Sequence, residues 1–487
     1  GYPQGDASLS IGGDGGGGGS AGIVTIQNKA AITTGDFNSA AIQAQSIGGS
    51  GGAGGMAASG TLNVGPNADI DVAVVLGGSG GSGGTAGATT VTNSGVLATT
   101  YANSDGIQAQ SIGGSGGAGG LTYNVLGNLL AGGHFNTKLD TTIGGAGGGS
   151  GTGGDVSVTN SAGITTAGTS SSAIYAQSVG GNGGKGGFGG TGIYNLASNT
   201  GEDDTSVGVD IGITVGGGGG ASAKGGDVTV DNQSGGAIKT SGAGAHGIFA
   251  QSVGGNGGDG GLASNYSGTV AGSCGPVDEV GLLSCKNDDG DTTTVELTLD
   301  LALGGKGETG ADAGTVKVTN DAAVATSGDV AHGIFAQSVG GGGGTGGATA
   351  TTSSAFYTRQ SGNNNDTVTS KLGSKTTLSD LGEGLGGATI LIGGSGNAGG
   401  DGAATTVTNS GAVSTTGVNA YGIFAQSVGG GGGSGGEGNS SKSDYTVAIG
   451  GSGRAAGIGG DVTITNSGAV TTAGYASAAL FAQSIGG

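Results

Sequence analysis

Few side chains in this chain of 487 residues have the types and spacing that catalysis or metal binding needs. His246 and His332 each precede a Gly-Ile-Phe sequence, and two aligned imidazoles could ligate a metal ion. Other copies of this position hold different residue types, which favours a tolerant surface position: Asp105, Ser172, Tyr421 and Ala478. The sequence contains neither a Gly-x-Ser-x-Gly elbow nor a P-loop lysine. We therefore expect no catalytic residue, no cofactor and no metal site, and we expect that the protein is not an enzyme.

A second group of candidates is acidic. Asp155, Asp227 and Asp461 each follow two glycines just before a β-branched segment. The calcium-binding Gly-Gly-x-Gly-x-Asp nonapeptide needs a short regular period, which this chain lacks. The acids within 288–291 also miss the EF-hand spacing. We expect Asp155, Asp227 and Asp461 to cap the starts of strands rather than to bind calcium.

The chain has two cysteines, Cys274 and Cys285, which are 11 residues apart. This separation suits a disulfide that closes a loop, and it fits neither a CxxC redox motif nor a four-ligand zinc site. Two free thiols on a loop are the alternative. Because no other cysteine occurs, we expect the disulfide and therefore an oxidising compartment.

The elements that must position all these residues belong to seven copies of one module. Each copy has a β-branched segment that ends in Asn, a turn, and a second segment with Ala-Gln-Ser before a glycine tract. The asparagines are Asn28, Asn93, Asn160, Asn232, Asn320, Asn409 and Asn466, and the glutamines are Gln45, Gln110, Gln177, Gln251, Gln337, Gln426 and Gln483. Each glutamine follows its asparagine by 17 residues (19 in the fourth copy), whereas successive glutamines are 57 to 89 residues apart. A constant module with variable connectors predicts a stacked array.

The first segment alternates between apolar and polar residues, as in Val228–Asn232, which predicts a half-buried strand with its valines and asparagine facing inward. A buried asparagine needs a partner, and stacking supplies the asparagine of the next repeat. We predict one ladder of the seven asparagines and another of the seven glutamines. The fold class is then an all-β parallel solenoid, similar to a right-handed β-helix, over a single domain 1–487. Its repeats end near 49, 114, 181, 255, 341, 430 and 487, and we expect a longer parent chain.

The second segment, such as Ile248–Val253, is apolar on both faces. Its phenylalanines should form an outer ladder that needs a cover: Phe249, Phe335, Phe424 and Phe481. Many glycine tracts repeat every three residues, which is typical of a polyglycine II-type helix, although flexible loops are the alternative. We predict ordered tracts packed on the phenylalanine ladder, with one coil per repeat. The stack would then be about 35 Å tall, whereas two coils per repeat would give roughly 65–70 Å.

A third β-branched segment precedes the second tract, for example at 207–213 and 295–301. Variable inserts lie between the first tract and this segment, and the longest span 262–294 and 348–387. Insertions in solenoids gather on one side, often the binding side. We expect these two inserts to protrude and to hold any ligand-recognition surface.

The composition limits the partners. The net charge is −20 with only 13 Lys and Arg residues, which disfavours nucleic acid and anionic bilayers. No run of 18 apolar residues occurs, so we expect no direct insertion of this segment into a membrane. The remaining partners are neighbouring repeats, further copies of the chain in a fibre, and ligands on a host or matrix surface.

The sequence Val407–Gly417 followed by Gly422–Gly430 resembles the repeats in passenger regions of large autotransporter-type bacterial surface proteins and adhesins. The resemblance runs through all seven repeats. It implies a right-handed parallel β-helix, export through the outer membrane, and a structural or adhesive role outside the cell.

Three functions follow as hypotheses. The first is an extracellular rod or fibre segment on a bacterial surface. The second is ice binding, since outward threonine pairs recur on the first segment, although Asp231 and Lys317 interrupt them. The third is a β-helical enzyme acting on polysaccharides, which would need a carboxylate cluster that the sequence does not show.

Overall fold

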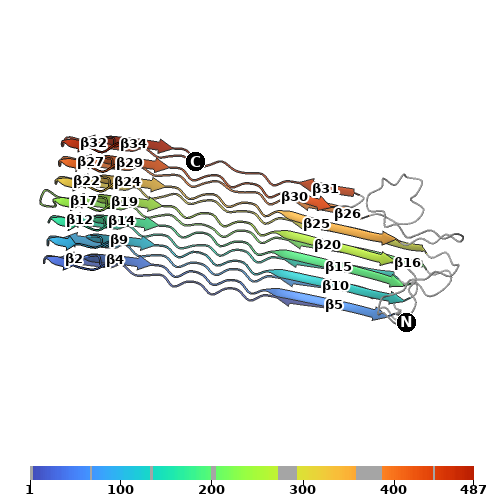
Figure 1. Ribbon diagram of the computed structural model, residues 1–487. Coiled ribbons are helices and arrows are strands. Elements are labelled where there is room, and N and C mark those ends of the chain that lie inside the picture. The colour runs from blue at the N-terminus through green and yellow to red at the C-terminus, as the bar shows by residue number, and fades with distance from the viewer. Residues whose placement is uncertain are drawn as a thin grey trace, which may run out of the picture.

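The computed structural model describes residues 4–65, 69–131, 135–198, 205–271, 293–357, 387–441 and 445–487. Among these residues every regular element is a β-strand, and all strand pairs are parallel between successive repeats. Each repeat makes one elongated coil, and the coils stack in register (Figure 1). Strands occupy both ends of every coil, and glycine tracts connect the two ends (Figure 1). Strands of successive repeats are direct neighbours in every sheet, which confirms one coil per repeat. Seven strands spaced by about 4.8 Å give a stack roughly 30–35 Å tall.

Three sheets form one end of the coil. The Asn sheet contains β2 (Val24–Asn28), β7 (Thr89–Asn93), β12 (Val156–Asn160), β17 (Val228–Asn232), β22 (Val316–Asn320), β27 (Thr405–Asn409) and β32 (Val462–Asn466). The short sheet contains β3 (Ile32–Thr34), β8 (Leu97–Thr99), β13 (Ile164–Thr166), β18 (Ile238–Thr240), β23 (Val324–Thr326), β28 (Val413–Thr415) and β33 (Val470–Thr472). The Gln sheet contains β4 (Ile42–Ile47), β9 (Ile107–Ile112), β14 (Ile174–Val179), β19 (Ile248–Val253), β24 (Ile334–Val339), β29 (Ile423–Val428) and β34 (Leu480–Ile485).

Two sheets form the other end. The outgoing sheet contains β5 (Ala57–Gly65), β10 (Thr122–Ala131), β15 (Gly189–Ser198), β20 (Ala263–Ala271), β25 (Thr349–Tyr357) and β30 (Gly438–Ser441). The return sheet contains β1 (Gln4–Ile11), β6 (Asp69–Leu76), β11 (Phe135–Ile143), β16 (Thr205–Val215), β21 (Thr293–Leu303), β26 (Ala388–Ile392) and β31 (Tyr445–Ile449). The return sheet holds the expected third segments, whereas the outgoing sheet was not predicted.

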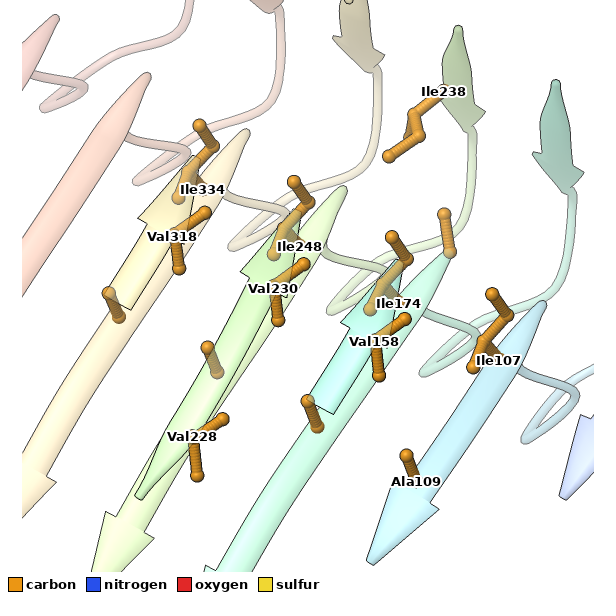
Figure 2. Close-up of a cluster of buried hydrophobic side chains, with 14 of the residues drawn as sticks. Ile107, Ala109, Val158, Ile174, Val228, Val230, Ile238, Ile248, Val318 and Ile334 are labelled. Atoms are coloured by element: carbon orange, nitrogen blue, oxygen red, sulfur yellow. The ribbon is translucent and has the colours of Figure 1, made fainter. Parts of the chain in front are cut away.

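The main apolar core lies between the Asn, short and Gln sheets. Inward valines of the Asn sheet face inward isoleucines and alanines of the Gln sheet, and in the five inner coils these side chains are fully buried. Figure 2 shows the pattern for Val158 with Ile174, repeated one coil further on by Val230 with Ile248. The alternation that the sequence shows in the first segment therefore places one residue in two in this core.

The glycine tracts are ordered and bond to one another. In the tract after the return strand β6, Gly77 and Gly80 donate their N–H groups to the same tract of the next coil, at Ile143 O and Ala146 O. Gly78 and Gly81 donate instead to the opposite tract, at Gly55 O and Gly52 O. The third residue of each triplet points outward. This period of three, with hydrogen bonds between parallel extended helices, is the polyglycine II arrangement.

The coils contain two kinds of glycine tract, and the length of each kind is the same from coil to coil. Twelve residues separate every return strand from the next strand of the Asn sheet, as in 77–88 between β6 and β7. Nine residues separate each of the first six strands of the Gln sheet from the outgoing strand that follows it, as in 113–121 between β9 and β10. Both lengths are whole numbers of triplets. Most of the variation in repeat length therefore lies between the outgoing and return strands.

Two predictions about connectors need correction. The tracts pack on one another beside the main apolar core, and so they do not cover the phenylalanine ladder of the Gln sheet. The ranges 262–294 and 348–387 are not simply protruding inserts, because they begin with the outgoing strands β20 and β25. The parts 272–292 and 358–386 lie outside the described residues.

Candidate functional site

The seven asparagines form a continuous ladder inside the coil. Each Nδ2 donates to Oδ1 of the asparagine in the next coil at 2.7–2.8 Å, from Asn28 to Asn466. In six coils Nδ2 also donates to a carbonyl two residues further on, for example from Asn320 to Ala322 O. In these six coils the amide thus joins two coils and also closes its own turn. The ladder is structural, since its polar groups are used within the stack.

The seven glutamines form a second ladder on the outer face of the Gln sheet. Each Nε2 donates to Oε1 of the glutamine in the next coil at 2.5–3.1 Å, from Gln45 to Gln483. The serine that follows each glutamine points inward and has a role that the sequence reasoning missed. Ser46 Oγ donates to Gly22 O and accepts the N–H of Gly87 in the next coil. Equivalent bridges recur at Ser111, Ser178, Ser252, Ser338 and Ser427.

The acids that precede the Asn sheet link successive coils. Asp155 Oδ1 accepts the N–H of Asp227, and Asp227 Oδ1 accepts the N–H and the hydroxyl of Thr315. The same arrangement joins Asp312 to the N–H of Asp401 on the outer side of a tract. These contacts support the prediction of strand caps for Asp155 and Asp227. Among the described residues no group of three or more His, Cys, Asp or Glu side chains could hold a metal ion.

His246 and His332 occupy a more constrained position than expected. Their rings stack with centroids 5.0 Å apart. His246 Nδ1 accepts the N–H of His332, and His332 Nδ1 accepts the N–H of Tyr421. Asp105 Oδ1 has the same role toward Ser172. The position tolerates several residue types, as predicted, but it is not a surface position, because His332 is buried and three of its residues supply an acceptor for the next coil: Asp105, His246 and His332.

The surroundings of these groups shift their protonation. Burial lowers the pKa of His246 to about 4, with a smaller contribution from the neighbouring His332. Burial also lowers the pKa of His332 to about 4. Burial raises the pKa of Asp105 to about 7, although the hydrogen bond from Ser172 opposes the shift. Because both Nδ1 atoms accept backbone hydrogen bonds, the neutral imidazole is the form that fits the stack.

The phenylalanine ladder is present on the outer face of the Gln sheet and is half-buried. Ring centroids of successive coils are 4.7–5.2 Å apart along the series Tyr175, Phe249, Phe335, Phe424 and Phe481. The rings shield one another, which reduces the need for a cover. His332 and Tyr421 extend the strip sideways through edge contacts with the phenylalanines.

A polar layer lies buried between the outgoing and return sheets. The strand register aligns Asp71, Lys138 and Asp210 on successive return strands, so the lysine lies between two carboxylates. All three are almost completely buried. Lys138 Nζ donates to the Asn195 side chain and to Tyr194 O. A buried charge is tolerated only with such compensation.

Two further buried acids have raised pKa values. Burial raises the pKa of Asp140 to about 6, and the neighbouring Asn124 and Thr191 side chains oppose this only in part. Burial likewise raises the pKa of Asp300 to about 6, against hydrogen bonds from Ser267 and Asn265. Because these carboxylates lie between two sheets, a polymeric substrate cannot reach them in this conformation.

Several predictions fall on other residues. The expected disulfide between Cys274 and Cys285 lies outside the described residues and stays a prediction, as does the role of 288–291. Within the described residues, no helix is long and apolar enough to cross a membrane. No protein-family model, curated protein or solved structure matches the chain.

Proposed function

We propose that this chain is a stiff structural segment with an adhesive role on the outer surface of a bacterial cell. The observation that carries the proposal is the continuity of hydrogen bonding along the stack. Strands, glycine tracts, asparagines and glutamines all form hydrogen bonds to the next coil, and the serines accept hydrogen bonds from it. Any bending or separation of coils must break several of these layers together, which is what a rigid spacer requires.

The location and the adhesive role rest on other features. The net charge of −20 and the shortage of cations fit a chain that is exposed to the medium and bound to neither nucleic acid nor anionic lipid. The resemblance of the repeats to autotransporter-type passenger regions supports export. The variable connections all leave the same end of the coil, where they could contact a host, a matrix or another copy.

Two measurements test the proposal. Antibodies against the purified chain should label intact cells of the organism that produces it as strongly as permeabilised cells. Beads coated with the chain should adhere to host or matrix surfaces more than beads coated with an unrelated acidic protein. Labelling only after permeabilisation would refute the surface location. Surface labelling without bead adhesion would refute the adhesive role and would still agree with a structural role at the surface.

A second candidate is ice binding, and the register of the Asn sheet favours it. Outward threonine pairs align in successive coils, as in Thr406/Thr408 beside Thr463/Thr465. Asp231 and Lys317 interrupt the rows in the middle of the sheet. A thermal hysteresis assay on the purified chain distinguishes the two functions, since a structural rod should give no hysteresis.

A further inference from the structure

The outer face of the outgoing sheet carries a cluster of aromatic rings. Tyr123, Phe188, Tyr194 and Tyr266 come from three successive coils, at or just before β10, β15 and β20. The Tyr194 and Tyr266 centroids are 5.1 Å apart, with ring planes tilted by 38°. Tyr123 and Tyr194 remain 49% and 45% exposed. We call these four rings the aromatic platform.

Glycines beneath the platform hold the rings close to the backbone. Gly190 and Gly192 are the outward residues of β15 before Tyr194, and both are buried. A Cβ atom on Gly190 would lie 2.5 Å from the Phe188 ring and 3.0 Å from the Tyr123 ring. A Cβ on Gly192 would lie 3.2 Å from the Tyr194 ring. One face of these rings thus covers the glycine backbone, and the other face is exposed to solvent.

We infer that the aromatic platform binds a neutral polysaccharide or oligosaccharide. One face of a pyranose ring presents C–H groups with partial positive charge, and these fit the electron-rich face of an aromatic ring. The platform is fixed by a sheet, so little side-chain freedom is lost on binding. The spacing between coils, about 4.8 Å, is close to the length of one sugar unit, so successive sugars could contact successive coils.

The margin of the platform supplies polar groups of the right kind. Lys185 lies one triplet before Phe188, and its Nζ is 3.7 Å from the Asp259 carboxylate in the next coil. The Lys185 side chain is 77% exposed and offers donors to sugar hydroxyls, whereas Asp259 is 40% exposed and its Oδ1 already accepts the N–H and the hydroxyl of Thr345. The net charge of −20 would repel acidic polysaccharides, which favours a neutral one.

This inference names the ligand class for the adhesive part of the proposed function and rests on it. The test uses the purified full chain and four soluble neutral probes: laminarin, cellohexaose, chitohexaose and dextran. Binding is measured by isothermal titration calorimetry or by affinity electrophoresis. We expect at least one probe to bind. Because the test does not depend on where the chain lies in the cell, failure to bind would leave the surface location standing.

Three variants separate ligand binding from structural cover of the glycines. Tyr194→Phe keeps the ring and should stay within threefold of the original affinity. Tyr194→Leu still covers Gly192 but removes the flat ring, and should weaken binding at least tenfold with an unchanged melting temperature. Tyr101→Ala removes a tyrosine of equal exposure elsewhere on the coil, 45%, and should leave affinity unchanged. Absence of binding to all four probes, or equal binding by Tyr194→Leu, would overturn the inference.

Discussion

Replacing Gly217 by alanine should destabilise the protein, whereas replacing the adjacent Gly218 by alanine should stabilise it. Gly217 and Gly218 belong to the same triplet of the tract that follows β16. A Cβ on Gly217 would lie 1.9 Å from Gly145 O and 2.8 Å from Gly187 N, in the middle of the hydrogen bond that joins those two residues. The nearest atom to a Cβ on Gly218 is Lys306 O, at 3.9 Å.

The magnitudes follow from these contacts. Gly217→Ala must displace packed backbone, at about 1–3 kcal/mol, and weakens the Gly187-to-Gly145 hydrogen bond, at about 0.5–1.5 kcal/mol. Alanine also restricts the unfolded chain, which returns about 0.4–1 kcal/mol. The net loss is roughly 1–4 kcal/mol. Gly218→Ala keeps only the last effect and should stabilise by about 0.4–1 kcal/mol.

Native-state hydrogen exchange is the suitable assay, because stacked repeats can open locally. In Gly217→Ala, amides of residues 144–151 and 183–188 should exchange roughly 5- to several-hundred-fold faster than in the unmodified chain. In Gly218→Ala their exchange should be unchanged or slower. Equal protection in the two variants would refute the packed polyglycine bundle and favour flexible tracts.

Other predictions concern the ladders and turns. Asn320→Leu should destabilise its coil by roughly 1–3 kcal/mol, because Asn232 and Asn409 lose a buried partner; unchanged exchange protection in β17 and β27 would contradict this. Val330 has φ 57°, whereas asparagine occupies the same turn position in three other coils: Asn38, Asn103 and Asn419. Val330→Asn should therefore increase the free energy of unfolding, measured with urea, by about 1 kcal/mol, and Asn419→Val should decrease it. The pKa of about 4 for His246 and His332 lies below the unfolded value, so the unfolded chain binds more protons between pH 4 and 6.5 and stability falls as pH falls through that window. The double variant His246→Asn/His332→Asn keeps an acceptor without the titration, and its stability should decline less than that of the unmodified chain between pH 7 and pH 4, by roughly 1–2 kcal/mol; parallel pH profiles would count against this.

Much of the main apolar core could be predicted because the sequence of its strands is periodic. The alternation in Val228–Asn232 fixes which side chains point inward, and the constant interval between asparagine and glutamine fixes their alignment. The glycine triplets also predicted ordered helices, although not their packing partner. The error about the phenylalanine ladder arose because the sequence does not show that stacked rings shield one another.

The outgoing sheet and its buried polar layer could not be predicted in this way. Strands such as β10 and β15 contain Asn, Thr and Gly at inward positions, so they lack the apolar alternation that marks a strand. Lys138 is acceptable inside because Asp71 and Asp210 lie beside it in neighbouring coils, up to 72 residues away in sequence. The role of His246 and His332 could not be predicted for the same reason, since the N–H groups that donate hydrogen bonds to their Nδ1 atoms belong to the next coil.

The constant lengths of the glycine tracts restrict how this fold can evolve. Inserting one or two residues in a tract would turn every later outward side chain into the bundle, where a Cβ meets backbone. Inserting three would add a full helical turn but leave that coil wider than those above and below it. The width of the molecule is therefore shared by all coils and can change only in whole turns, in every coil together. Deletions and insertions can accumulate instead at the six connections from outgoing to return strands, where each coil can diverge alone.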